Sequence, residues 1–228
     1  MRSGTGPSGL KVFAAAVVAV TVGLAATGCT GDNAPGAETT PSSASSSAAG
    51  PSMTFEEAYR KVPMDGTKDL PITWDLAGAP DTGEVLAARR SLAYNYWLDQ
   101  ATDWTPIIPI GRFVYTEEFN EKFLAPYATT TSDDPLVGPI WVKVMGVEQT
   151  GPDQARVTFC TDLGYWHHAQ TKDAEVRAKR GTVQSYVMEN VESGDGERHW
   201  LADRMLDPDV DRQAKYGTAC TKWAQHQP

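Results

Sequence analysis

Signatures of the common catalytic sites are missing from residues 53–228, which make up most of the chain. This region has no G-x-S-x-G or S-x-x-K nucleophile motif, no H-E-x-x-H zinc motif and no G-x-x-x-x-G-K-[ST] phosphate loop. It also lacks a C-x-x-C pair and an acidic calcium-loop pattern. We therefore expect no metal, no cofactor and no catalytic residue that a motif would identify.

Positive charge is also scarce. The chain has 20 lysine and arginine residues against 29 aspartate and glutamate residues, and its net charge is −9 at pH 7. An acidic surface repels phosphate groups. We therefore expect no nucleic acid as a partner, and no attraction between the surface and anionic lipid head groups.

A long hydrophobic run is missing as well. The basic N-terminus leads into Val12–Ala26, an apolar run too short to span a membrane comfortably, and small residues then precede Cys29. This pattern resembles the signal peptide of bacterial lipoproteins, although Ala26 stands where leucine is commonest. The resemblance implies that residues 1–28 are removed, and that Cys29 carries palmitate-type acyl chains and anchors the protein to the outer face of the cell membrane. The alternative is an ordinary secretory signal.

The segment after this cysteine has little to form a core. Residues 29–52 are mainly Ser, Ala, Thr, Gly and Pro, a composition that cannot bury enough apolar surface to offset the entropy of ordering. We expect a disordered tether there. Residues 53–228 remain, a length suited to one domain with a core of its own.

Only three cysteines are present. If Cys29 carries the lipid, Cys160 and Cys220 remain as a pair, and the compartment outside the membrane permits their oxidation. A disulfide between them would close a loop of about 60 residues and stabilise the fold by about 4 kcal/mol. Two buried free thiols are the alternative.

Helical patterns come first in the folded part. Thr54 is expected to cap a short helix that stops before Pro63, and Met64–Pro80 is expected to be irregular. Glu84–Gln100 repeats apolar residues at helical spacing, and Thr116–Ala125 predicts a second helix.

From residue 139 the apolar pattern alternates with period two. Four strands are predicted, separated by turn residues: Pro139–Gln149, Gln154–Trp166, Thr182–Glu192 and Arg198–Leu206. The strand that begins at Gln154 is expected to bury one face. Helices followed by an antiparallel meander indicate an α+β fold, with the N-terminal helices packed on one face of a curved antiparallel sheet.

This order of elements resembles the NTF2-like (cystatin-like, SnoaL-like) cone fold over about Thr54–Pro208. The V-x-F-C-x-D segment at Val157–Asp162, and the later strand with His199-Trp200-Leu201, are similar to uncharacterised secreted lipoproteins of high-GC Gram-positive bacteria. The resemblance implies a fold rather than one activity, because this fold hosts isomerases, dehydratases, cyclases and non-enzymatic binders.

Enzymes of this fold place an Asp or His general base, often with a Tyr, inside the cone, which gives one functional hypothesis. Candidate residues of these types are Asp162, His167, His168, His199, Asp203 and Tyr186. The two adjacent histidines would point to opposite faces of a strand, and turn capping is the simpler role for Asp162. His199 and Asp203 have the same strand parity and could share a face. No constellation singles out a catalytic subset.

The favoured hypothesis is a non-enzymatic binding or interaction module of the cell envelope. Its pocket would be lined by Tyr96, Trp97, Trp141, Asp162, Tyr186 and His199. The ligand would be a small apolar molecule, or the partner another envelope protein. Two alternatives stay open, namely that these aromatic residues simply fill the core, and that the domain is an isomerase, dehydratase or cyclase.

Overall fold

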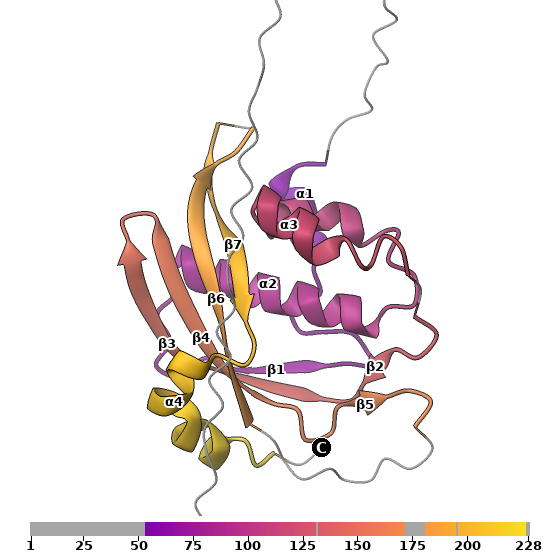
Figure 1. Cartoon of the computed structure of the whole chain (residues 1–228), viewed down its shortest axis with the longest axis vertical. Coiled ribbons are helices and arrows are strands. Elements are labelled where there is room, and N and C mark those ends of the chain that lie inside the picture. Colours follow the sequence, from indigo (N-terminus) through magenta and orange to yellow (C-terminus); the bar gives the residue numbers. More distant parts are fainter. Residues whose placement is uncertain (1–52, 131, 172–180, 195, 227–228) are drawn as a thin grey trace, which may run out of the picture. The chain divides into compact units, whose positions relative to one another are not determined.

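The computed structural model describes residues 53–130, 132–171, 181–194 and 196–226. The predicted signal peptide, the tether and the lipidation site Cys29 lie outside these ranges. Within the ranges, no helix combines the length and apolar character that crossing a membrane requires. The described residues form a mixed α+β structure in which a curled, mainly antiparallel sheet packs against helices (Figure 1).

Helix α1 (Phe55–Lys61) begins at a capping box, as its sequence predicts. The Thr54 hydroxyl accepts a hydrogen bond from the backbone N–H of Glu57 (3.2 Å), and the Glu57 carboxylate accepts one from the N–H of Thr54 (2.8 Å). Both bonds satisfy donors that the first helical turn leaves unpaired. The predicted helix start is therefore confirmed.

Two further helices were expected. Helix α2 (Gly83–Gln100) buries the predicted stripe that includes Leu92 and Tyr96, whereas Leu86 at the edge of the stripe is exposed. The 3₁₀-helix η1 (Ile108–Phe113) has proline in its first turn, and α3 (Glu117–Leu124) follows it. Proline removes backbone donors, which explains why regular α-helix starts only after η1.

Five strands form the main sheet, in the order β1-β3-β4-β6-β7. They are β1 (Ile72–Asp75), β3 (Ile140–Gly151), β4 (Gln154–Asp162), β6 (Gly181–Glu192) and β7 (Arg198–Leu206). The last four are antiparallel neighbours, as the alternating pattern predicts. The short strands β2 (Leu136–Val137) and β5 (His167–His168) pair separately.

Strand β1 corrects the expectation that Met64–Pro80 is irregular. It runs parallel to β3, with Ile72 opposite Ile140. Four residues are too few to show a period, and the pairing partner lies far along the chain, so local sequence did not reveal this strand.

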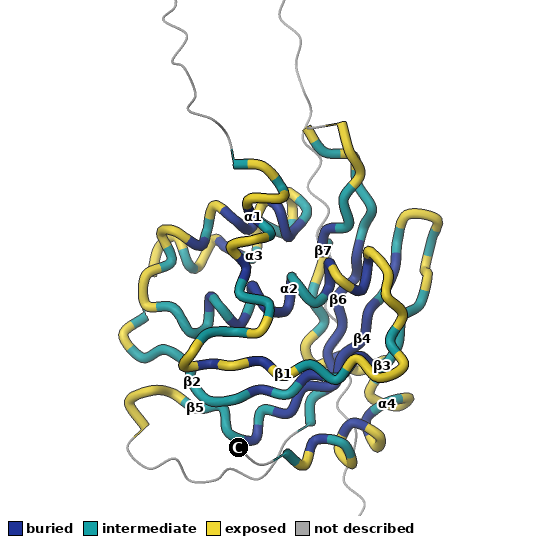
Figure 2. The backbone as a smooth tube through the Cα atoms, turned by 180° about the vertical axis from the view of Figure 1, so that it is seen from behind, coloured by how far each residue is buried: buried dark blue, intermediate teal, exposed yellow. Residues whose placement is uncertain are grey.

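The second face of the sheet is also covered, which corrects the prediction that helices lie on one face only. Helix α4 (Val210–Trp223) packs there, on the side opposite α2 (Figure 1). Along β4, Phe159 faces the main core, while Cys160 faces α4, and both are fully buried. Figure 2 shows the buried central parts of β4 and β6. A helix that the sequence pattern did not identify thus buries the second face.

Covalent and ionic contacts hold α4 in place. Cys160 of β4 and Cys220 of α4 form a disulfide. Asp209, the N-cap of α4, is buried and accepts hydrogen bonds from the guanidinium of Arg156 (Nε to Oδ2, 3.0 Å). Glu148 of β3 binds two further basic residues of the helix. These contacts fix the C-terminal helix against the sheet.

Candidate functional site

The concave face of the sheet carries polar side chains among the core residues. Gln184 of β6 donates from Nε2 to the hydroxyl of Tyr96 on α2 (3.2 Å) and to the hydroxyl of Thr161 on β4 (2.6 Å). Tyr186 follows two residues after Gln184, so both side chains lie on this face. Helix α2 and the sheet thus bring together Tyr96 and Tyr186, two of the predicted pocket residues.

Two tyrosines on this face have hydroxyl groups without a partner. Tyr115 lies beside β7, because both of its chain neighbours bond to Ala202 of that strand. The N–H of Ala202 donates to the carbonyl of Val114, and the carbonyl of Ala202 accepts a hydrogen bond from the N–H of Thr116 (both 2.9 Å). Tyr115 and Tyr186 are fully buried, and neither hydroxyl oxygen has a hydrogen-bond partner among the described residues. Burial raises the pKa of both phenols far above the ordinary value, and neighbouring tyrosines and acidic residues raise it further.

Asp99 is the central ionisable group of this region. It lies in the last turn of α2, three residues after Tyr96, and is half-buried. Burial, followed by the charge of Asp207, raises the pKa of the Asp99 carboxyl from 3.8 to about 7. Asp99 therefore changes its charge near neutral pH.

Two more residues complete the group. Asp207 follows β7, and the residue as a whole is exposed. Burial of its carboxyl raises the pKa of that group, and a hydrogen bond with Thr182 opposes this by lowering the pKa. Burial and the charge of Asp99 raise the pKa of Tyr127 to about 12. We refer to the six residues as the tyrosine–carboxylate cluster: Tyr96, Asp99, Tyr115, Tyr127, Tyr186 and Asp207.

A cleft of about 880 Å³ lies between α3 and β7, and one residue of the cluster, Tyr127, is part of its lining. We call it the α3 cleft, and its lining comprises Glu118, Phe119, Lys122, Phe123, Pro126, Tyr127, Asp203, Arg204 and Met205. Tyr127 belongs to both the cleft and the cluster, and Met205 lies directly opposite Tyr186 in the β6–β7 pairing. The cleft therefore adjoins the cluster at Tyr127, and Met205 in its lining is the strand partner of Tyr186.

A second cleft, of about 1010 Å³, lies on the other side of α3, between that helix, the start of α1 and the β6–β7 hairpin. Tyr115 is part of its lining. The short helix α3 thus lies between two openings, and both have a tyrosine of the cluster in their walls.

The remaining predicted pocket residues lie elsewhere. Trp141 and Asp162 face α4: Trp141 stacks on His226 (5.1 Å between ring centroids), and Asp162 is fully buried. The Asp162 carboxylate accepts hydrogen bonds from the backbone N–H of Gly164 (3.0 Å) and of His226 (3.1 Å). Trp97 contacts Tyr94 edge-on. The six predicted residues therefore do not form one pocket, and Asp162 has the turn-capping role that its position suggested.

The histidine candidates are also separated from the cluster. His199 stacks on Phe55 of α1 (3.7 Å between ring centroids). His167 and His168 form the short strand β5. The pairing of β6 with β7 is irregular at Asp203, because Arg204 and Ala202 pair with adjacent residues of β6 and Asp203 lies between them. Side chains therefore do not alternate regularly from His199 to Asp203, and the expectation that these two residues share a face does not hold.

Sequence reasoning missed Asp99, Tyr115, Tyr127 and Asp207. A weak signal was present for Asp99, because it lies three residues after Tyr96 and so on the same helical face. No local sequence pattern indicated the other three residues, because they lie in segments outside the regular helices and strands.

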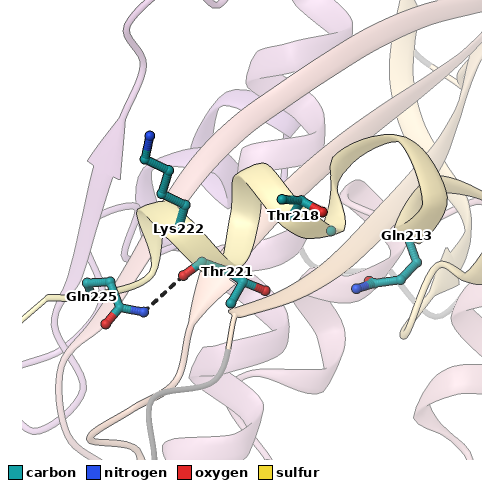
Figure 3. A pocket seen from close by; sticks show the side chains of 6 residues that line it. Gln213, Thr218, Thr221, Lys222 and Gln225 are labelled. Carbon is teal, nitrogen blue, oxygen red and sulfur yellow. Dashed lines mark hydrogen bonds between the residues drawn. The ribbon is translucent and has the colours of Figure 1, made fainter.

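The outer surface of α4 has a shallow, polar hollow lined by Gln213, Gly217, Thr218, Thr221, Lys222 and Gln225 (Figure 3). Gln225 closes one end by donating a hydrogen bond from Nε2 to the backbone carbonyl of Thr221 (2.9 Å). This hollow has no aromatic floor and no buried ionisable group. Within the described ranges, no group of three or more His, Cys, Asp or Glu residues is arranged to hold a metal ion.

No protein-family model matches this sequence, and the searches of curated proteins and of solved structures found no match either. The arguments for function therefore come from the residues and contacts of this chain.

Proposed function

We propose that the protein is an extracytoplasmic lipoprotein, anchored by Cys29, whose NTF2-like domain binds a small and largely apolar molecule in the α3 cleft. The single observation that carries the binding function is the α3 cleft itself, because its lining combines the aromatic rings of Phe119, Phe123 and Tyr127 with charged side chains. Ligand sites combine an apolar surface with a few convergent polar groups in this way.

The lining of the cleft suits an apolar ligand. Phe119 and Phe123 contact each other (5.2 Å between ring centroids), and Tyr127 adjoins Phe123 (6.0 Å). Charged side chains, including Lys122 and Arg204, also line the cleft and are themselves half-exposed or more. Apolar surface with charged groups around it would hold a ligand by burial and orient it by its polar end.

The NTF2-like assignment is part of the proposal. It is supported by the long helix α2, which packs on a curled, mainly antiparallel sheet, with Tyr96 of the helix bonded to Gln184 of β6 between the two layers. In folds of this kind the space between helix and sheet hosts the ligand site.

The binding function is tested with N-phenyl-1-naphthylamine, a neutral probe whose fluorescence rises in apolar surroundings. We expect saturable binding that Phe123→Ser weakens about tenfold, because a lost ring contact of about 1.4 kcal/mol corresponds to that factor. The matched control is Leu86→Ser, which makes the same kind of change at an exposed position of α2. Equal effects of the two substitutions, or no saturable binding by the unaltered protein, would contradict the proposal.

The anchor is tested separately by cell fractionation. Cys29→Ala removes the thiol that a lipid would occupy, so the protein should leave the membrane fraction, whereas Thr27→Ala keeps a small residue near the cleavage position and should leave it anchored. Membrane retention of the Cys29→Ala protein would overturn the lipoprotein assignment.

An enzymatic function is the second candidate, and Asp99 is the observation that favours it. A carboxyl with a pKa of about 7, close to buried phenols, has the properties of a general base for isomerisation or dehydration. A panel of small ketones in D₂O tests this by NMR. Exchange of the α-hydrogens by the unaltered protein, absent with Asp99→Asn, would establish proton abstraction, and no exchange with any ketone would count against it.

An envelope protein as partner has less support. The large apolar side chains that are exposed in the described residues are Leu76, Leu86 and Val210, and Val210 lies on α4, away from the other two in the sequence. Isolated exposed apolar residues are normal on monomeric proteins.

A further inference from the structure

The segment after α4, residues 224–226, is attached to the sheet through His226. The backbone N–H of His226 and its ring nitrogen Nδ1 both lie 3.1 Å from Oδ2 of Asp162 on β4. The ring stacks on Trp141 (5.1 Å between ring centroids), which lies opposite Asp162 in the β3–β4 pairing, and meets Trp223 edge-on (4.6 Å). Because an ionised carboxylate only accepts hydrogen bonds, Nδ1 of His226 is the donor.

Asp162 is the more shielded member of this pair. Its side chain has no exposed surface, whereas that of His226 is 30 % exposed. Among the described residues, His226 is the only basic residue with a nitrogen within 4.0 Å of the Asp162 carboxylate, whose other oxygen accepts a hydrogen bond from the N–H of Gly164 (3.0 Å). Shielding an ionised carboxylate from water is costly unless a cation compensates its charge. Protonated His226 supplies that cation, and neutral His226 supplies hydrogen bonds alone.

The two ends of α4 are fixed by different kinds of charge pair. At the start of the helix, the buried Asp209 binds Arg156, and an arginine side chain stays charged throughout the physiological pH range. Beyond the end of the helix, Asp162 binds a histidine, and an imidazole changes its charge between about pH 5 and pH 8. A change of pH within this range thus alters one attachment of α4 and leaves the other unchanged.

The other charged groups near this end of α4 do not change their charge over the same range. Asp75 of β1 binds Nζ of Lys143 on β3 (2.5 Å) and accepts a hydrogen bond from Nε1 of Trp223 (3.0 Å). The hydrogen bond from Lys143 holds the pKa of the Asp75 carboxyl below its usual value, so this pair stays ionised. Lysine and tyrosine side chains titrate near pH 10. The titratable groups around His226 are Asp162, Asp75, Lys143, Tyr165 and Lys222.

We propose that His226 is a pH-dependent latch that holds residues 224–226 on the sheet. Asp162 attracts the positive charge of the protonated imidazole, so protonation favours the attached segment. The attachment is strongest below about pH 5 and weakens as the pH rises toward 8, where the segment opens more readily and uncovers Trp141 and the Asp162 carboxylate. The latch lies on the α4 face of the sheet and is independent of the ligand site that we propose beside α3.

The test follows the backbone amide of residue 226, which donates to Asp162, by NMR hydrogen exchange on the purified protein. Its protection factor is measured against an unfolded peptide of the same local sequence, which removes the direct effect of pH on exchange. This factor should fall about fivefold from pH 5.5 to pH 8. A fivefold change corresponds to about 1 kcal/mol, the upper end of the range for an ion pair with one exposed partner.

His226→Gln keeps a side-chain donor without a titratable charge, so the amide of residue 226 should be protected equally at both pH values. Asp162→Asn keeps an acceptor oxygen without the charge and should also abolish the pH dependence; if this variant does not fold, His226→Gln decides alone. His168→Gln is the matched control, because His168 pairs with Asp134 (3.4 Å) at an exposed position, and it should leave the fivefold fall unchanged. A protection factor of the unaltered protein that does not fall, or a fall that persists in His226→Gln, would overturn the proposal.

Discussion

Replacing Asp99 with asparagine should stabilise this protein at alkaline pH, although the substitution removes an ionisable carboxyl group from the candidate site. The reason is that the fold raises the pKa of this carboxyl from 3.8 to about 7. A raised pKa means that folded chains bind the proton more tightly than unfolded chains do. Ionisation of Asp99 therefore opposes folding.

The sign and the pH window follow from these two values. Below about pH 4 the carboxyl is protonated in both states and costs nothing. Between about pH 4 and pH 7 the unfolded chain has released the proton and the folded chain has not, so stability falls as the pH rises. Above pH 7 the full penalty applies, which is about 4 kcal/mol at 1.36 kcal/mol per pKa unit. Because Asp99 is only half-buried, solvent screening reduces the expected penalty to about 2 kcal/mol.

Urea unfolding of the unaltered protein and of the Asp99→Asn variant at pH 8 and pH 5 measures this effect. The variant should be more stable by about 2 kcal/mol at pH 8 and by about a third of that at pH 5. Asp81→Asn, at an exposed position, should show no difference at either pH. A stability gain that does not change with pH, or a loss of stability at pH 8, would refute the conclusion that the fold destabilises the ionised form of Asp99.

Two further predictions concern the attachment of α4. Replacing Cys160 and Cys220 together with serine should lower the free energy of unfolding by about 4 kcal/mol, because the disulfide closes a loop of 60 residues. Thiol titration of the denatured, unreduced protein should detect neither cysteine. Finding both of them reactive would contradict the pairing. Arg156→Met should cost about 3 kcal/mol in urea unfolding, since it leaves the buried Asp209 carboxylate without its cation. Arg198→Met, which breaks an exposed pair, should cost less than about 1 kcal/mol, and an equal cost for the two arginines would refute the argument.

Local patterns predicted most of the regular elements. The apolar stripe of α2 and the alternation in β3, β4, β6 and β7 are properties of neighbouring residues, and the structure confirms these elements. The position of α4 on the second face was not predicted. Its Asp209 N-cap is an ordinary helix start in the sequence, and β4 is buried on both faces because tertiary contacts, among them those of Arg156 and Cys160, hold α4 on the second face.

The candidate site was less accessible to sequence reasoning, for a physical reason. Tyr96 and Tyr186 were expected in a pocket because each lies in a recognisable helix or strand. Asp99 looks in the sequence like any acidic residue at a helix end. Its raised pKa arises from burial and from Asp207, which lies more than a hundred residues further along the chain. Electrostatic coupling of this kind has no local pattern.

The two faces of the sheet differ in a way that argues for the site of function. On the α4 face, a disulfide links the helix to the sheet and ion pairs compensate the charges, as in the pair of Arg156 with Asp209, and the Nε of Arg212 has no hydrogen-bond partner in the described residues. On the α2 face, the hydroxyls of Tyr115 and Tyr186 have no partner in the described residues and Asp99 has no cation. A buried polar group without a partner costs about 1 to 3 kcal/mol, so a fold keeps several of them together only where something else satisfies them. A bound ligand would recover that cost, which is the argument for the ligand site that we propose beside α3 and for a structural role of α4.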